Sequence, residues 1–208
     1  MQRFPAPLVA LVAAASVLLA THPAQAHGLA AGGGFAGLIH PLVGLDHLLM
    51  LMAVGAAAVC IAPTVLFWAL GGAVIGAALG VAGWTVPAAE VFAALAIAAV
   101  GGMILLASQR RAPGGALASF APLAGAVVAS GVALHALLHG LEAPQDASTL
   151  FWWSGALVSS ALVTGSTVLL LRRLPNRWTE VAAIGFLVLG SLLAVAPLGL
   201  FTGGAAAA

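Results

Sequence analysis

The chain has 208 residues, of which 63% are hydrophobic and only 5% are charged, and its formal net charge is +1. Soluble domains carry about a quarter charged residues, so this composition excludes a water-soluble fold, and the near-zero charge excludes a basic nucleic-acid binder. Runs rich in Ala, Leu, Val and Gly, without a ten-residue alternation, favour helices over a barrel. We therefore predict an all-α integral membrane protein.

The first 26 residues have the pattern of a secretory signal peptide. Arg3 precedes the apolar stretch 7–20, which is followed by the small-x-small sequence of Ala24, Gln25 and Ala26. We expect cleavage after Ala26, which makes His27 the first residue of the mature chain. An uncleaved first membrane helix is the alternative, and in both cases residue 27 lies outside the cytoplasm.

Six apolar runs follow, each close to the ~20 residues that a helix needs to cross a bilayer. They are residues 43–61, 64–84, 88–107, 117–141, 149–171 and 180–201. Short separators rich in Pro, Gly and charge join them, so consecutive helices should pack as antiparallel neighbours. We predict a single domain, residues 27–208, that forms a bundle of six transmembrane helices.

The arginines predict the orientation of this bundle. Arg110 and Arg111 lie between the third and fourth runs, and Arg172, Arg173 and Arg177 lie between the fifth and sixth. Positively charged loops stay in the cytoplasm. The mature N-terminus is therefore expected in the periplasm, as the export signal independently requires, and the protein is expected in the bacterial inner membrane.

Two further patterns leave alternatives open. Gly72, Gly76 and Gly80 form a stripe that lets another helix approach closely, either within one chain or between copies in a homo-oligomer. The run 149–171 is rich in Ser and Thr. These hydroxyls are expected to bond the backbone of their own helix, with the lining of an ion path as the alternative.

Ionisable side chains gather at the exported ends of two predicted helices, where their burial is costly and indicates function. His40, Asp46 and His47 lie at the start of the first run. His135, His139 and Glu142 end the fourth run with i, i+4, i+7 spacing, which places them on one helical face. Histidines at i and i+4 can chelate one divalent metal, and a carboxylate on the next turn can bind the metal or orient its ligands. Each histidine alone would more simply be a hydrogen-bonded packing residue.

His40 and His47 pose a geometric problem. On a straight helix beginning near Pro41 they would lie about 10 Å apart along the axis, too far to bind one ion together. We therefore expect Asp46 and His47 to need partners from the helix at 117–141. His40 joins them only if the chain bends between Pro41 and Gly44.

The ligand types narrow the choice of metal. Imidazole nitrogen with carboxylate oxygen, and no thiolate, suits Ni(II), Co(II), Zn(II) or Cu(II). Glu90 is a weaker candidate because it also fits the N-terminus of a helix, and Asp146 is expected to be a solvated loop charge.

The stretch HPLVGLDHLLMLMAVG, residues 40–55, resembles the signature H-P-x-x-G-x-D-H of the HupE/UreJ family of hydrogenase and urease accessory membrane proteins. His135, His139, Gly140 and Glu142 match a second motif of that family, H-x-x-x-H-G-x-E, and the resemblance covers the whole mature chain.

The resemblance implies a secondary permease that imports Ni(II), or in some members Co(II), across the inner membrane, with the ion as cargo and no permanent cofactor. It implies that the metal residues are His40, Asp46, His47, His135, His139 and Glu142. His27 would add an imidazole and a free amine at the periplasmic entrance. The expected partners are the metal ion and the lipid bilayer, not nucleic acid.

Three rival functions remain at this point. A haem protein could use paired histidines as axial ligands, and a sensor or metallochaperone subunit would bind metal without moving it. A metal-dependent intramembrane enzyme is the third, but the sequence offers no nucleophile with a convincing partner, so we expect no enzymatic activity. Nothing in the motifs separates nickel from cobalt.

Overall fold

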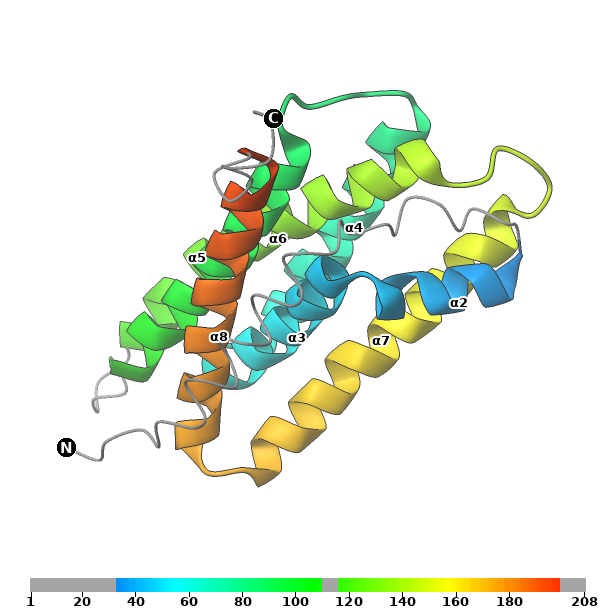
Figure 1. Cartoon of the computed structure of the whole chain (residues 1–208). Helices are drawn as coiled ribbons and strands as arrows, with labels where there is room; N and C mark the ends of the chain where they lie inside the picture. Colours follow the sequence, from blue (N-terminus) through cyan, green and yellow to red (C-terminus); the bar gives the residue numbers. More distant parts are fainter. Residues whose placement is uncertain (1–32, 110–115, 199–208) are drawn as a thin grey trace, which may run out of the picture.

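The computed structural model describes residues 33–109 and 116–198, and within these ranges all regular secondary structure is helical, with no strand (Figure 1). The α-helices are α2 (Gly34–Val43), α3 (Leu45–Cys60), α4 (Val65–Val81), α5 (Ala89–Gln109), α6 (Ala116–Glu142), α7 (Thr149–Arg173) and α8 (Asn176–Val195). A short 3-10 helix, η2 (Ala196–Leu198), follows α8. The predicted signal peptide and His27 lie outside the described residues.

The described helices are those of a membrane protein. Four of them, α5 to α8, are long and apolar enough to cross a bilayer, and α2 with α3 would make a fifth span as a bent pair. With 17 residues, α4 is shorter than a typical span. Each of the six predicted runs overlaps one of the helices α3 to α8, although α8 begins four residues before the predicted run 180–201 and ends at Val195. Six complete crossings stay a prediction.

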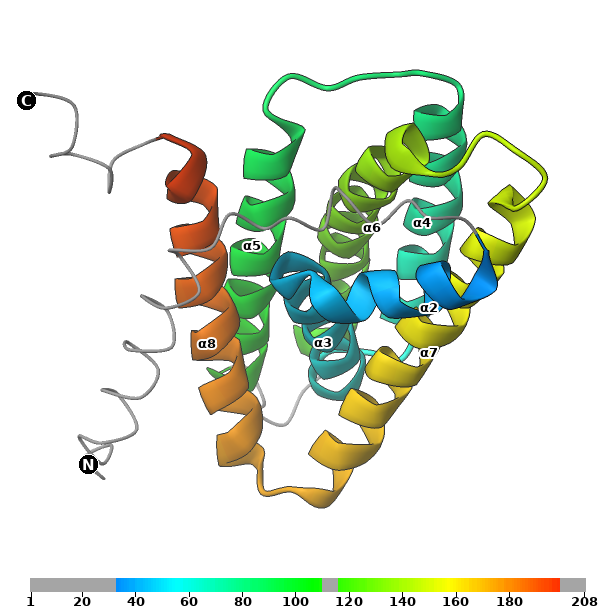
Figure 2. The ribbon, with the colours of Figure 1, turned by 45° about the vertical axis from the view of Figure 1, so that its right-hand side comes forward.

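The first predicted run differs most from the structure. A separate helix, α2, precedes it, and Pro41 lies inside the last turn of α2 rather than at the start of α3. Gly44 has an extended backbone that separates the two helices, whose axes meet at 81°. Proline cannot donate a helical hydrogen bond, so the helix is weakened where it ends. Figure 2 shows α2 lying across the bundle, with α3 running down into it.

The core of the bundle surrounds α3, which packs against α4, α5, α6, α7 and α8. Its buried face consists mainly of small residues, including Ala53, Ala56 and Ala57, and it meets Ile97 and Ile104 of α5. Small side chains let helix backbones approach closely, and the resulting van der Waals contacts hold membrane helices together. The position of α3 is therefore fixed from several sides.

The glycine stripe of α4 faces α6 within the same chain. A Cβ atom at Gly72, Gly76 or Gly80 would overlap the carbonyl oxygen of Ala129, Ala133 or Leu137, respectively. The two backbones are thus in direct contact along three turns. The alternative left open by the sequence is settled for these glycines in favour of a contact inside one chain.

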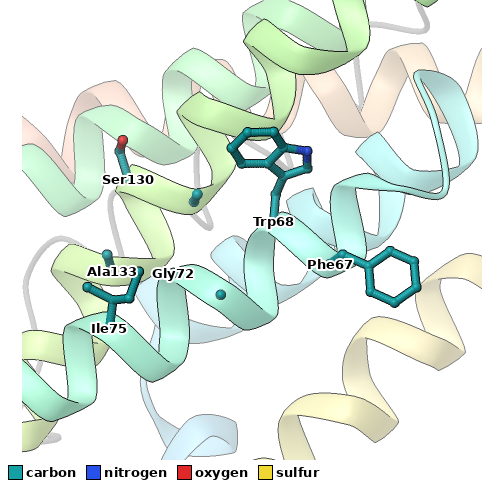
Figure 3. A pocket seen from close by; sticks show the side chains of 8 residues that line it. Phe67, Trp68, Gly72, Ile75, Ser130 and Ala133 are labelled. Atoms are coloured by element: carbon teal, nitrogen blue, oxygen red, sulfur yellow. The ribbon is translucent and has the colours of Figure 1, made fainter.

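An apolar groove lies on the outer side of this helix pair (Figure 3). Phe67, Trp68 and Ile75 of α4 line it together with Ser130 and Ala133 of α6. The large side chains of α4 that point away from α6 are also exposed, as expected for a helix that faces lipid.

Several hydroxyls of α7 bond the backbone of their own helix, as the sequence predicts. Ser159 donates to the carbonyl oxygen of Ala156 at 3.1 Å, and Thr167 donates to that of Val163 at 2.9 Å. Thr164 instead donates to the carbonyl oxygen of Leu51 in α3, at 3.3 Å. These three hydroxyls therefore serve contacts with the helix backbone.

Candidate metal centre

The bend at Gly44 brings His40 back over the start of α3. His40 lies in the last turn of α2 and His47 in the first turn of α3, and their ring centroids are 5.1 Å apart. A straight helix would have separated the two rings by two turns. The sequence predicts that His40 joins the site only if the chain bends between Pro41 and Gly44. The chain does bend there, and His40 joins the site.

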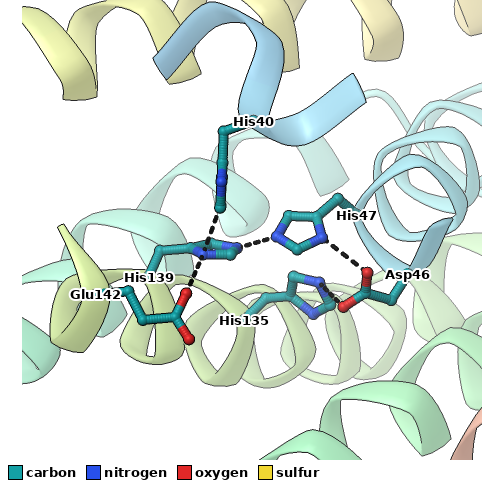
Figure 4. Close-up of polar contacts among 6 residues, drawn as sticks. All are labelled: His40, Asp46, His47, His135, His139 and Glu142. Atoms are coloured by element: carbon teal, nitrogen blue, oxygen red, sulfur yellow. Dashed lines mark hydrogen bonds and ion pairs between the residues drawn. The ribbon is translucent and has the colours of Figure 1, made fainter. Parts of the chain in front are cut away.

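The third partner is His139 of α6. Its Nδ1 lies 3.0 Å from Nε2 of His40, in a hydrogen bond between the two rings, and its Nε2 is in close contact with Nε2 of His47. His139 therefore bridges the two histidines of the bent pair (Figure 4). The tight α4–α6 contact holds this end of α6 in place, since a Cβ at Gly140 would lie only 2.7 Å from Gly80.

Asp46 connects the bent pair to His135, one turn before His139 on α6. Nδ1 of His47 donates to Oδ1 of Asp46 at 2.8 Å, and Nε2 of His135 lies 3.3 Å from Oδ2. A carboxylate that accepts the Nδ1 proton of a histidine fixes its tautomer and leaves the Nε2 lone pair for a metal. Asp46 is thus placed to orient His47 and to contribute an oxygen ligand.

Glu142 lies at the margin of this cluster. Its Oε2 is 4.0 Å from Nδ1 of His139, beyond the length of a hydrogen bond. In this position the carboxylate adds negative charge beside the imidazoles.

The remaining sequence candidates lie elsewhere. His27 is outside the described residues, and Glu90 is in the first turn of α5. Asp146 is exposed in the loop between α6 and α7, where Ser148 donates to its carboxylate through a backbone N–H and a hydroxyl. These hydrogen bonds hold the pKa of Asp146 below its usual range. Asp146 is the solvated loop charge that the sequence predicts.

The cluster is buried and rich in lone pairs. His40, His47 and His135 are each at most 7% exposed. Nδ1 of His135 has no hydrogen-bond partner among the residues that the structure describes. Buried polar groups are normally hydrogen-bonded, so an imidazole left unpaired in this way is consistent with a ligand position.

Two helix ends also favour a cation here. α2 and α6 each end beside the cluster, with His40 and His139 in their last turns. The C-terminus of a helix carries partial negative charge, which stabilises a nearby cation. The backbone thus adds to the attraction of the carboxylates.

Sequence reasoning missed the surface that holds α2 in place. Gly37 packs against the backbone of Trp152 in α7, and the Trp152 ring lies 5.0 Å from that of His40. With Ala143 and Ala156, Trp152 forms a small hydrophobic cluster separate from the core around α3. No local signal marks these residues, because their role depends on a contact between distant segments.

We expect the Gly37→Ala variant to bind Ni(II) at least about 10-fold more weakly than the wild type, a loss typical of a disturbed ligand environment. The added Cβ would overlap the carbonyl oxygen of Trp152, so α2 must shift and carry His40 with it. Calorimetric titration of the purified protein in detergent measures the change. Gly34→Ala is the control, because its Cβ would meet Phe151 at an ordinary 3.4 Å. Equal affinities for the two variants would contradict the role of this contact.

Comparison with known proteins agrees with the motifs. A family model described as HupE / UreJ protein matches residues 9–200, which include every described helix. Comparisons with curated proteins and with solved structures give no significant match. Because the family model covers nearly the whole chain and the family's two histidine motifs meet in one buried cluster, the chain belongs to the HupE/UreJ family.

Proposed function

We propose that this protein is a secondary permease that imports Ni(II), or Co(II), across the bacterial inner membrane for the maturation of hydrogenase or urease. The observation that carries the proposal is the cluster of His40, His47, His135 and His139 with Asp46, in which three of the histidines are buried. Family membership supports a role in nickel or cobalt supply. The proposed activity is transport, and the protein is not proposed to be an enzyme.

The ligand set suits a transported ion. Neutral imidazoles and carboxylates bind divalent ions of the later first-row metals, and the absence of cysteine from the cluster disfavours Cu(I). Metal–nitrogen bonds of about 2.0–2.1 Å place the ligand atoms within roughly 4 Å of one another. Ring nitrogens of the cluster already approach this spacing, with 3.0 Å between His40 and His139.

The cluster also lies at the proposed entrance. Trp152, which packs on His40, is near the start of α7, whereas Arg172 and Arg173 are at its other end. The positive-inside rule would put the arginines in the cytoplasm. An ion from the periplasm would then meet the cluster first.

The membrane potential would supply the driving force. Moving a divalent cation inward through 100 mV gains roughly 4.6 kcal/mol, twice the value for a single charge. The sequence contains no lysine, and hence no phosphate-binding loop of the G-x-x-x-x-G-K type. We therefore propose that uptake needs no nucleotide hydrolysis by this chain.

The haem alternative fits the cluster poorly. Neighbouring imidazole centroids are 4.2–5.8 Å apart, and the rings contact one another directly. Two axial histidines would need a porphyrin between them. An absorption spectrum of the purified protein without a Soret band is the expected result.

Uptake of radioactive nickel by cells that lack their own nickel importers tests the proposal. Cells producing the wild type should accumulate nickel, and the His47→Ala variant should reduce this uptake by at least about 10-fold, since His47 contacts both Asp46 and His139. Immunoblotting of membranes verifies equal protein levels. Nickel binding without uptake by the wild type would favour a sensor or metallochaperone, and unchanged uptake by His47→Ala would contradict the site.

A further inference from the structure

The cluster contains two sets of three ligands that share one histidine. The imidazole set consists of His40, His47 and His139. The carboxylate set consists of Asp46, His47 and His135. In each set, one ligand atom from every residue lies within 4.8 Å of the other two.

The shared residue, His47, faces the two sets with opposite sides of its ring. Its Nε2 contacts His139, and its Nδ1 points to Asp46. A neutral imidazole has one lone pair, on one nitrogen or the other according to the tautomer. His47 can therefore bind a metal in one set at a time.

His40 of the imidazole set and His135 of the carboxylate set lie on opposite sides of the His47 and His139 rings. Figure 4 shows His40 above these two rings and His135 below them. The rings of His135 and His139 have the largest centroid separation among the contacting histidines, 5.8 Å. Among the described residues, no set of three ligand atoms within 4.8 Å of one another contains both His40 and His135, so one ion bonded at about 2.1 Å to His40 would not bind His135 as well.

His135 has two features expected of a metal ligand, namely burial and a ring nitrogen without a hydrogen-bond partner among the described residues. It is 7% exposed, and its Nδ1 has no hydrogen-bond partner within residues 33–109 and 116–198. Its Nε2 lies 3.3 Å from Asp46, yet the pair does not meet the geometry of a hydrogen bond. A bound cation between the Asp46 carboxylate and the His135 ring would satisfy both.

The two sets follow each other along α6. His135 precedes His139 by one helical turn, about 6 Å along the axis. The carboxylate set is therefore nearer the start of α6, and the imidazole set is nearer its end, where α2 also ends.

We propose that the cluster binds its divalent ion at two successive positions, first in the imidazole set and then in the carboxylate set. The ion passes between them when the imidazole of His47 exchanges its tautomer: the proton leaves Nδ1 and Nε2 becomes protonated as the ion leaves it, so that Nδ1 replaces Nε2 as the metal-binding atom. The second position adds a formal negative charge, which draws the ion one turn further into the bundle. This inference rests on the proposed function, because it divides the transport site into two steps.

Cobalt binding distinguishes two positions from one. Co(II) is titrated into the purified full-length chain in detergent, and its visible absorption reports whether the ligands are imidazoles alone or include a carboxylate. His40→Ala should remove only the imidazole set, and His135→Ala only the carboxylate set. We expect each variant to keep one Co(II) site, with spectra that differ from each other, whereas His47→Ala binds at least about 10-fold more weakly.

Each outcome has a distinct meaning. If His40→Ala and His135→Ala both lose Co(II) binding, the cluster is a single site; the two-position proposal is then wrong, and the permease proposal stands. If either variant keeps the affinity and spectrum of the wild type, its residue is no ligand and the proposal is also wrong. No Co(II) or Ni(II) binding by the wild type would overturn the proposed function itself. Circular dichroism verifies folding, and His40→Gln and His135→Gln replace any alanine variant that fails to fold.

Discussion

The Asp46→Asn variant is expected to lower nickel uptake by about 10- to 100-fold, the range found when a carboxylate that orients a metal-binding histidine is removed. Oδ1 of Asp46 accepts the Nδ1 proton of His47 at 2.8 Å, and Oδ2 lies 3.3 Å from His135. Asparagine keeps the shape of the side chain but loses its negative charge, and its amide offers an acceptor oxygen to only one of the two rings while its N–H groups face the other. The change therefore affects two histidines and the attraction for the cation together.

Asp146→Asn is the matched control for this experiment. Asp146 is exposed in the loop between α6 and α7, and its carboxylate accepts hydrogen bonds from Ser148 at 2.8 and 2.6 Å. The same chemical change there should leave uptake at the wild-type level. Radioactive nickel uptake, normalised to the amount of protein in the membrane, measures both variants. Equal uptake by the two would show that Asp46 has no special role.

The Gly76→Val variant is expected to destabilise the folded protein by about 3 kcal/mol, the upper range for overpacking a tight contact. A Cβ at this position would overlap the carbonyl oxygen of Ala133, and the overlapping atom belongs to the backbone, which cannot rotate away. α4 and α6 must then separate, and they lose the van der Waals contacts that hold membrane helices together.

Gly71→Val provides the comparison on the same helix. Gly71 is exposed, and a Cβ there would have no atom within 4 Å. The fraction of protein that stays monodisperse after heating in detergent should fall at a lower temperature for Gly76→Val than for Gly71→Val. If both variants behave alike, the glycine stripe contributes little to the α4–α6 contact.

The positions of the long helices were predictable from the sequence, because an apolar run that must satisfy its own backbone in a bilayer has few alternatives to a helix. Each of the six predicted runs overlaps a helix of the structure, from α3 to α8. α2 was not predicted. It has only 10 residues, including Gly34, Gly37 and Pro41, and its position depends on docking against α7.

Part of the candidate site could be predicted from helix periodicity and from the membrane side expected for each motif. The spacing of His135 and His139 and their common end with Asp46 and His47 anticipated a meeting of the two motifs. The sequence left the place of His40 open, since extended and helical backbones at Gly44 are both reasonable. The 81° bend resolves that alternative in favour of contact. Trp152 was missed because aromatic residues near a helix end carry no sign of what they touch.

The glycine stripe shows a similar limit. Its four-residue spacing predicted a close helix contact, yet spacing alone does not identify the partner. The partner is α6, which carries His135 and His139. A feature that the sequence assigned to packing therefore also positions half of the candidate site.

The bend between α2 and α3 has a consequence for how the membrane potential would act on transport. With α3 along the membrane normal, α2 lies nearly in the membrane plane, because their axes meet at 81°. The 16 residues of α3 then extend over about 24 Å of a hydrocarbon layer roughly 30 Å thick. Asp46 and His47 begin this helix, so an ion reaching them has crossed only about a fifth of the electric field. In the proposed transport, capture of the cation would then be almost independent of voltage, and the potential would accelerate its release toward the cytoplasm.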